Sequence, residues 1–216
     1  MNLIQNGDFE EPAITGDGWM QFPDGAVPGW TVEYNAACVH NPKSHQSSLK
    51  VWNQGSCSGN QNVELDGEPD VISGPVYDTV KISQSVATVP GKHYVLSYAL
   101  APTPGVADNQ MKVWVNGMEV ASHVASGVGQ VLPVLKWKRA TYEFDAADSV
   151  TSVVFAEVGP SDGAGMHLDA VSLTPARQQS SSGSGNLHWL GSAQLHKEPA
   201  STNKLGQPPA NENFGP

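Results

Sequence analysis

Trp114 is the side chain whose spacing best suits it to bind a ligand. It lies in "MKVWVNG", where Met111, Val113 and Val115 alternate with Lys112 and Trp114. Alternate side chains of a strand point to opposite faces, so Trp114 faces away from the core if the aliphatic residues face it. An exposed indole offers a large, flat apolar surface on which a ligand can pack. Packing of Trp114 under a loop or against a neighbouring subunit is the alternative.

Polar residues on other expected strands complete the predicted ligand face. In "KRATYEFDA", Tyr142 and Phe144 take one side, which leaves Arg139 and Glu143 on the other. The short strand "NVELD" contributes Glu64. The sequence therefore predicts a ligand face made of Trp114, Arg139, Glu143 and Glu64. By contrast, Trp19 and Trp30 lie among turn residues and are interpreted as anchors of the core or of loops.

Catalytic motifs are missing from the sequence. It contains no G-x-S-x-G, no H-E-x-x-H and no glycine-rich phosphate loop. The seven histidines are scattered, without the close spacing typical of metal ligands. We therefore expect a non-catalytic protein.

The two cysteines, Cys38 and Cys57, allow one disulfide. Closing a loop of about 20 residues would stabilise the fold by about 3 kcal/mol on the chain-entropy model. A bridge would indicate an oxidising compartment or an extracellular particle. Two free buried thiols are the alternative.

Charge and hydropathy exclude several classes of partner. The net charge is −10, whereas proteins that bind nucleic acid through phosphate need a basic face. The same charge argues against anionic membranes, and no apolar run approaches the about 18 residues of a membrane span. The N-terminus also shows no secretion signal.

Short alternating segments joined by turns indicate the fold class. Strand patterns recur from residue 60 to residue 173, with turn signals at Pro90-Gly91 and Asn116-Gly117. The opening residues before Asn6 also resemble a strand. No segment has a helical pattern longer than two turns. The sequence predicts an all-β, antiparallel jelly-roll β-sandwich over residues 1–175.

Composition changes after Pro175. Residues 176–216 begin with the Ser/Gly-rich linker "RQQSSSGSGN" and continue as an irregular, polar tail. The compact apolar cluster of this tail is Leu187, Trp189 and Leu190. Either the tail is disordered, or these three residues dock on a partner.

The ordered motifs resemble the galactose-binding-domain-like β-sandwiches, which include carbohydrate-binding modules and DUF642-type extracellular domains. The resemblance rests on "NLIQNGDFEEP" and "VPGW" at the start, "ISQSVATVPGKHYVLSYAL" and "VWVNG" in the middle, and "HLDAVSL" at the end. It covers residues 2–174.

This resemblance implies a structural Ca²⁺ between the first and last strands. The residues that match the usual ligands are Glu10 and Asp169, with Asp8 as a further participant. Asp169 has the parity of Val171 and Leu173, so we expect it to point inward, where a carboxylate must be paired or bound. Oxygen ligands favour calcium over transition metals. A carboxylate that caps main-chain N–H groups is the alternative.

The resemblance, with Trp114, predicts a non-catalytic module that binds a glycan or cell-surface polysaccharide, either extracellular or on a particle surface. The alternative is a structural or decoration subunit of a phage virion or extracellular assembly, whose C-terminal tail docks on a neighbouring subunit. Nucleic acid and membrane insertion are not expected.

Overall fold

The computed structural model describes residues 1–16, 18–34, 48–67, 78–160 and 162–176. These residues form strands and connections, and none forms a helix long and apolar enough to cross a bilayer. The strands are β1 (Trp19–Pro23), β2 (Thr31–Tyr34), β3 (Ser48–Trp52), β4 (Asn62–Glu64), β5 (Asp66–Gly67), β6 (Asp78–Ala87), β7 (His93–Pro102), β8 (Asn109–Val115), β9 (Met118–Ala125), β10 (Lys138–Asp145), β11 (Val150–Glu157) and β12 (Met166–Pro175).

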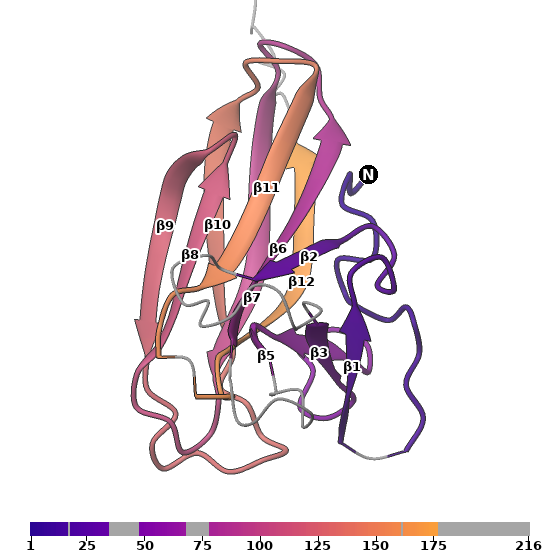
Figure 1. The fold of residues 1–216 in the computed structure, drawn as a ribbon. Helices are drawn as coiled ribbons and strands as arrows, with labels where there is room; N and C mark the ends of the chain where they lie inside the picture. The colour runs from indigo at the N-terminus through magenta and orange to yellow at the C-terminus, as the bar shows by residue number, and fades with distance from the viewer. Residues whose placement is uncertain (17, 35–47, 68–77, 161, 177–216) are drawn as a thin grey trace, which may run out of the picture. The chain divides into compact units, whose positions relative to one another are not determined.

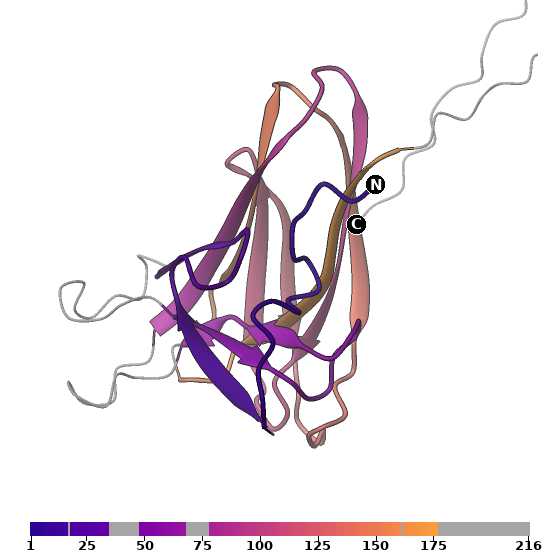
Figure 2. The ribbon, with the colours of Figure 1, turned by 90° about the vertical axis from the view of Figure 1, so that its right-hand side faces the viewer.

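The strands make two sheets that pack face to face (Figures 1 and 2). The first sheet has the order β1-β3-β4-β12-β7-β10, and the second has the order β2-β6-β11-β8-β9, with β5 paired to β6. All pairings between the described strands are antiparallel. The predicted all-β antiparallel sandwich is confirmed.

The core forms between the sheets from alternate positions of each strand. The side chains that β7 and β8 contribute to this core at alternate positions are Tyr94, Leu96, Tyr98, Leu100, Met111, Val113 and Val115. The indole of Trp30 is also buried, with its centroid 5.3 Å from that of Phe9 and 6.3 Å from that of Phe155. Trp30 is therefore the core anchor that the sequence predicts.

The N-terminal segment lies beside the last strand but is not itself a strand, which corrects one prediction. Leu3 N donates to Leu173 O at 2.8 Å, and Val171 N donates to Gly7 O at 2.7 Å. Asn6 and Phe9 have positive φ angles of 49° and 54°, so the chain turns here instead of remaining extended. The start and the end of the sandwich are thus joined.

The chain divides into two compact units, Met1–Gln178 and Gln179–Pro216. All described residues belong to the first unit. The last described strand ends at Pro175. The boundary predicted between residues 175 and 176 stays a prediction. The tail, with Leu187, Trp189 and Leu190, lies outside the described residues.

Candidate functional site

Trp114 lies on the outer face of the second sheet. Its neighbours Val113 and Val115 are buried in the core, whereas Trp114 is half-buried and points the other way. The hairpin after it turns at Asn116 and Gly117, both with positive φ, and returns the chain as β9. Burial of Val113 and Val115 in the core and the tight turn after β8 together fix the direction of the indole.

Val154 and three serines share the outer face of the second sheet with Trp114. Val154 of β11 is its cross-strand partner, and Ser83 of β6 lies opposite Val154. Two residues further along these strands, Ser152 lies opposite Ser85. No ring pair among the described residues includes Trp114. The indole therefore adjoins Val154, and the hydroxyl group of Ser83 lies one strand further on the same face.

Two ion pairs lie on the same outer face of the second sheet. Lys112 Nζ lies 2.9 Å from Glu119 Oε2, and Lys81 Nζ lies 3.1 Å from Glu33 Oε2. All four side chains reach solvent, and exposed pairs contribute at most about 1 kcal/mol, so a ligand could replace either pair at little cost. The Trp114 face consists of Lys81, Ser83, Ser85, Lys112, Trp114, Glu119, Ser152 and Val154.

The other predicted ligand residues are not on this face. Arg139 and Glu143 are exposed on β10, which belongs to the first sheet. Their side chains leave the opposite side of the sandwich from Trp114, because each points outward from its own sheet. Glu143 Oε2 lies 3.2 Å from His93 Nε2. Sequence alternation gives the face of a strand but not the sheet that the strand joins.

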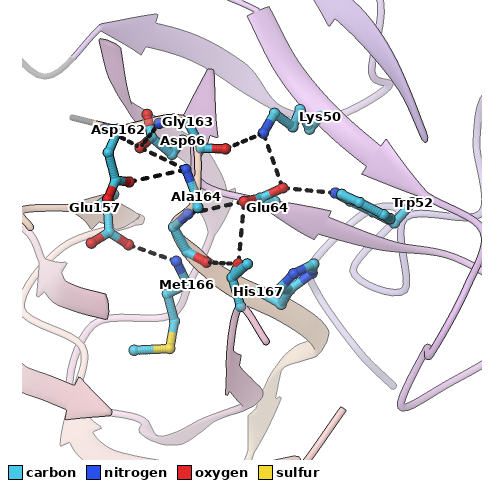
Figure 3. Close-up of polar contacts among 12 residues, drawn as sticks. Lys50, Trp52, Glu64, Asp66, Glu157, Asp162, Gly163, Ala164, Met166 and His167 are labelled. Atoms are coloured by element: carbon cyan, nitrogen blue, oxygen red, sulfur yellow. Dashed lines mark hydrogen bonds and ion pairs between the residues drawn. The ribbon is translucent and has the colours of Figure 1, made fainter. Parts of the chain in front are cut away.

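Glu64 is buried and is already bound by other protein groups (Figure 3). Its carboxylate accepts hydrogen bonds from Lys50 Nζ at 3.2 Å and Trp52 Nε1 at 2.9 Å. Gly165 N and Thr103 Oγ1 donate to its second oxygen. Burial raises the pKa of Glu64, and the Lys50 charge opposes that rise. The prediction that Glu64 meets Trp114 in one ligand face is wrong.

Two further buried carboxylates hold the connection between β11 and β12 (Figure 3). Asp66 Oδ2 accepts the N–H groups of Asp162, Gly163 and Ala164 at 2.9–3.2 Å. Glu157 accepts those of Gln110, Gly159 and Met166 at 2.7–3.1 Å. Burial raises the pKa of each carboxyl to about 7. These residues fix a loop and do not face an open ligand surface.

His167 belongs to the same buried region. Its Nδ1 lies 2.8 Å from Asn62 Oδ1, and its ring packs edge-on to Trp52 with centroids 5.7 Å apart. Burial lowers the pKa of His167 to about 3, so the imidazole is neutral. Because Asn62 donates to Gln54 O, its Oδ1 is free to accept the Nδ1 proton of His167.

Two of the three carboxylates predicted to bind calcium, Asp169 and Glu10, accept main-chain N–H groups, whereas no hydrogen bond is found for Asp8 among the described residues. Asp169 Oδ2 accepts Cys57 N at 2.6 Å and Ser58 N at 2.8 Å, and Glu10 Oε1 accepts Asn60 N and Gln61 N. Burial raises the pKa of Asp169 to about 6. N–H donors do not bind a cation, and no metal-binding group of three acidic, His or Cys side chains occurs in the described part of the chain. These contacts do not favour a Ca²⁺ ion, which stays a prediction that melting curves with EDTA would test.

The direction of Asp169 differs from the prediction for a local reason. The register of β12 against β7 shifts between Asp169 and Ser172, and Ala170 has a φ of 51°. This bulge breaks the parity between Asp169 and the buried Val171 and Leu173, so Asp169 faces away from the core residue Leu168 and also from the side that those two residues take. It lies under the 53–61 connection instead of in the core.

Cys57 and Trp19 are two further residues that the sequence singled out. Cys57 is a free thiol in the structure, with Arg139 Nη2 3.5 Å from its sulfur. Cys38 lies outside the described residues, so the disulfide stays a prediction. Trp19 is 42% exposed at the edge strand β1, where it lies 5.5 Å from Lys50 Nζ. It is therefore not a core anchor.

Sequence reasoning missed the neighbours of Trp114. Lys81, Ser83 and Ser85 alternate with Ile82 and buried residues of β6, so their outward direction could be read from the sequence. Their position beside β11, on the same outer face as Trp114, could not be read from the sequence, because β6 and β11 are far apart in the chain.

The two packed antiparallel sheets define this chain as a β-sandwich protein. The family model of DUF642, described as a protein of unknown function, matches residues 2–173, and the chain belongs to the DUF642 family. A search of curated proteins gave no significant match.

Several solved structures resemble the sandwich at low identity. A CBM4 structure matches at 14% identity and a TM-score of 0.42, over 80% of this chain and 99% of that one. A CBM22-1 xylan-binding domain from Paenibacillus barcinonensis matches at 16% and 0.43, over 75% and 97%. The K3 adhesin domain of Lys-gingipain from Porphyromonas gingivalis matches at 13% and 0.47, over 68% and 91%.

Proposed function

We propose that this protein is a non-catalytic carbohydrate-binding module that binds a glycan on the Trp114 face. The observation that carries the proposal is an indole directed away from the core, on the same outer face of the sheet as the hydroxyl-bearing side chains of Ser83, Ser85 and Ser152 on β6 and β11. The outer face of the first sheet offers no such surface near Glu64 and Asp169, because these side chains are buried beneath connections between strands.

Binding would combine an apolar and a polar contribution. The half-buried indole offers a flat apolar surface that costs little conformational entropy to hold in place. Ser83, Ser85 and Ser152 can donate hydrogen bonds to ring hydroxyls or accept them. Lys112 and Glu119 supply stronger, charge-assisted hydrogen bonds at the rim.

Removal of the indole tests this proposal directly. A panel of polysaccharides is first surveyed by affinity electrophoresis, and binding of the best ligand is then measured by calorimetry. Trp114→Ala is expected to weaken binding at least about tenfold, while its unfolding free energy falls by less than about 1 kcal/mol because the ring packs little of the core.

Trp19→Ala is the matched control, since Trp19 is an exposed tryptophan on the other sheet. It should bind as the wild type does. Unchanged affinity in Trp114→Ala, an equal loss in Trp19→Ala, or no binding to any glycan would contradict the proposal.

An extracellular location is part of the same proposal, since cell-surface polysaccharides lie outside the cell. The assembly alternative, in which the tail docks on a neighbouring subunit, stays a prediction because Leu187, Trp189 and Leu190 lie outside the described residues.

A further inference from the structure

The connection between β9 and β10 exposes an unusual amount of aliphatic surface. Residues 126–137, here called the apolar loop, extend past the ends of both strands (Figure 1). The exposed side chains are Val128 (64%), Val131 (75%), Leu132 (38%) and Val134 (68%), and Val124 adjoins them at the end of β9 (71%). Contiguous apolar patches larger than a few hundred Å² are rare on monomeric proteins and often mark a binding site.

Hydrogen bonds fix the loop in this conformation. Gly127 N donates to Val106 O at 2.7 Å, and Gly105 N donates to Gly127 O at 2.9 Å. The side chain of Gln130 bridges the loop, because its Nε2 donates to Ser126 O and its Oε1 accepts Lys136 N. The valines are therefore held in solvent by a defined backbone.

Two anchors tie the far end of the loop to the sandwich. Leu135 is buried, and Trp137 Nε1 donates to Gly55 O at 2.7 Å. Gly55 is needed at this point, since a methyl group there would meet Pro133 O. Leu135 and Trp137 thus hold the apolar loop on the sandwich, whereas its three valines and Leu132 face water.

Charge on and beside the loop is opposite in sign to that of the whole chain. Residues 126–142 contain no Asp or Glu but include Lys136, Lys138 and Arg139, in a chain of net charge −10. All three cations are exposed, and none takes part in the ion pairs found among the described residues. The neighbouring 103–108 connection contributes one acid, Asp108.

We propose that the apolar loop docks on a lipid bilayer that contains anionic lipids. Val128, Val131, Leu132 and Val134 would enter the boundary between headgroups and acyl chains, and Lys136 and Lys138 would contact the headgroups. Aliphatic side chains gain from burial in hydrocarbon without a shaped pocket, and each cation near an anionic surface adds attraction.

The composition of the loop favours a bilayer over a protein partner. Protein interfaces rely on Trp, Tyr and Arg at their centres, whereas the exposed apolar side chains here are all aliphatic. The composition of the exposed surface thus suits a bilayer.

The net charge of −10 predicts repulsion from an anionic membrane. However, exposed charges interact over only about 8–10 Å at physiological salt, and a strand of ten residues is about 33 Å long. Acids at the far end of the sandwich are therefore screened from a bilayer at the apolar loop.

Vesicle co-sedimentation of the full chain tests the proposal. Vesicles of phosphatidylcholine with about 30 mol% phosphatidylserine are compared with pure phosphatidylcholine at low and high salt. The protein should bind the anionic vesicles at least about tenfold more strongly at low salt, and the difference should shrink as salt rises. Val131→Asp with Val134→Asp should remove binding to both kinds of vesicle.

Val89→Asp with Val150→Asp is the control pair. These valines are 57% and 53% exposed beside the β6–β7 and β10–β11 connections, at the other end of the sandwich. This variant and Trp114→Ala should bind vesicles as the wild type does, which separates the proposal from that of glycan binding. Circular dichroism would verify that each variant is folded.

Three outcomes would overturn the proposal. They are no vesicle binding by the wild type, equal losses in the loop and control variants, and an oligomer that Val131→Asp with Val134→Asp converts to a monomer without any vesicle binding. The last result would show that the loop contacts a second copy of the chain.

Discussion

Lys50 and Glu64 form an ion pair that is almost closed to water, with side-chain exposures of 2% and 1%. Lys50 Nζ also donates to Gly163 O at 2.5 Å, so one ammonium joins β3, β4 and the β11–β12 connection. Burying two charges costs much of what their attraction returns. The pair is therefore more important for holding the loop in place than as a net source of stability.

Lys50→Met should be strongly destabilising, because it leaves the Glu64 carboxylate buried without its cation. We expect a loss of about 3 kcal/mol or more in the free energy of unfolding, measured by urea denaturation at neutral pH. Lys112→Met is the matched control, since the Lys112–Glu119 pair is exposed, and it should cost less than about 1 kcal/mol. Equal effects of the two substitutions would refute this view of the cluster.

At the scale of elements, the N-terminal segment completes the sandwich beside β12. Asn2 Oδ1 accepts Leu173 N at 2.9 Å, and the main chain of Gly7 accepts Val171 N. This close approach explains the glycine: an added methyl group at Gly7 would overlap the carbonyl oxygen of Val171. The segment therefore belongs to the fold although it lacks regular strand geometry.

Gly7→Ala should lower the free energy of unfolding by about 2 kcal/mol or more, because main-chain atoms must move to admit the methyl group. Gly91→Ala separates this effect from backbone strain. Gly91 has a φ of 74° with open space around it, so its substitution should cost about 1 kcal/mol. Thermal and urea denaturation of both variants measure the difference, and a smaller loss in Gly7→Ala than in Gly91→Ala would contradict the packing argument.

At the scale of the whole molecule, buried carboxyls make stability depend on pH. Burial raises the pKa of Asp66 and Glu157 to about 7 and that of Asp169 to about 6, from ordinary values near 4. Between these values the folded state binds more protons than the unfolded state, so these groups stabilise the fold as pH falls through 7. His167 acts in the opposite direction below about 6.5, because its pKa is lowered to about 3.

We expect the three carboxyls to outweigh His167 between pH 8 and pH 6. The free energy of unfolding should then be on the order of 1–2 kcal/mol higher at pH 6 than at pH 8. Urea denaturation at the two pH values measures this difference, and Asp66→Asn should reduce it. A wild type that is more stable at pH 8 would show that these carboxyls remain charged when buried.

The sequence by itself determined the class of fold and the direction of many side chains. Alternation in "HYVLSYAL" and "MKVWVNG" marked the core residues of β7 and β8 and directed Trp114 outward. The Asn116-Gly117 turn marked the hairpin between β8 and β9. These features are local, because side-chain alternation and turn conformation depend on neighbouring residues in the chain.

Only the tertiary structure decided which side chains meet. It placed Arg139 in the first sheet and Trp114 in the second, buried Glu64 beside Lys50, and turned Asp169 toward Cys57 N and Ser58 N by a bulge. Strand pairing joins segments far apart in the chain, as when β12 lies between β4 and β7. The sheet that a strand joins depends on the burial of the whole set of strands, which no local pattern contains.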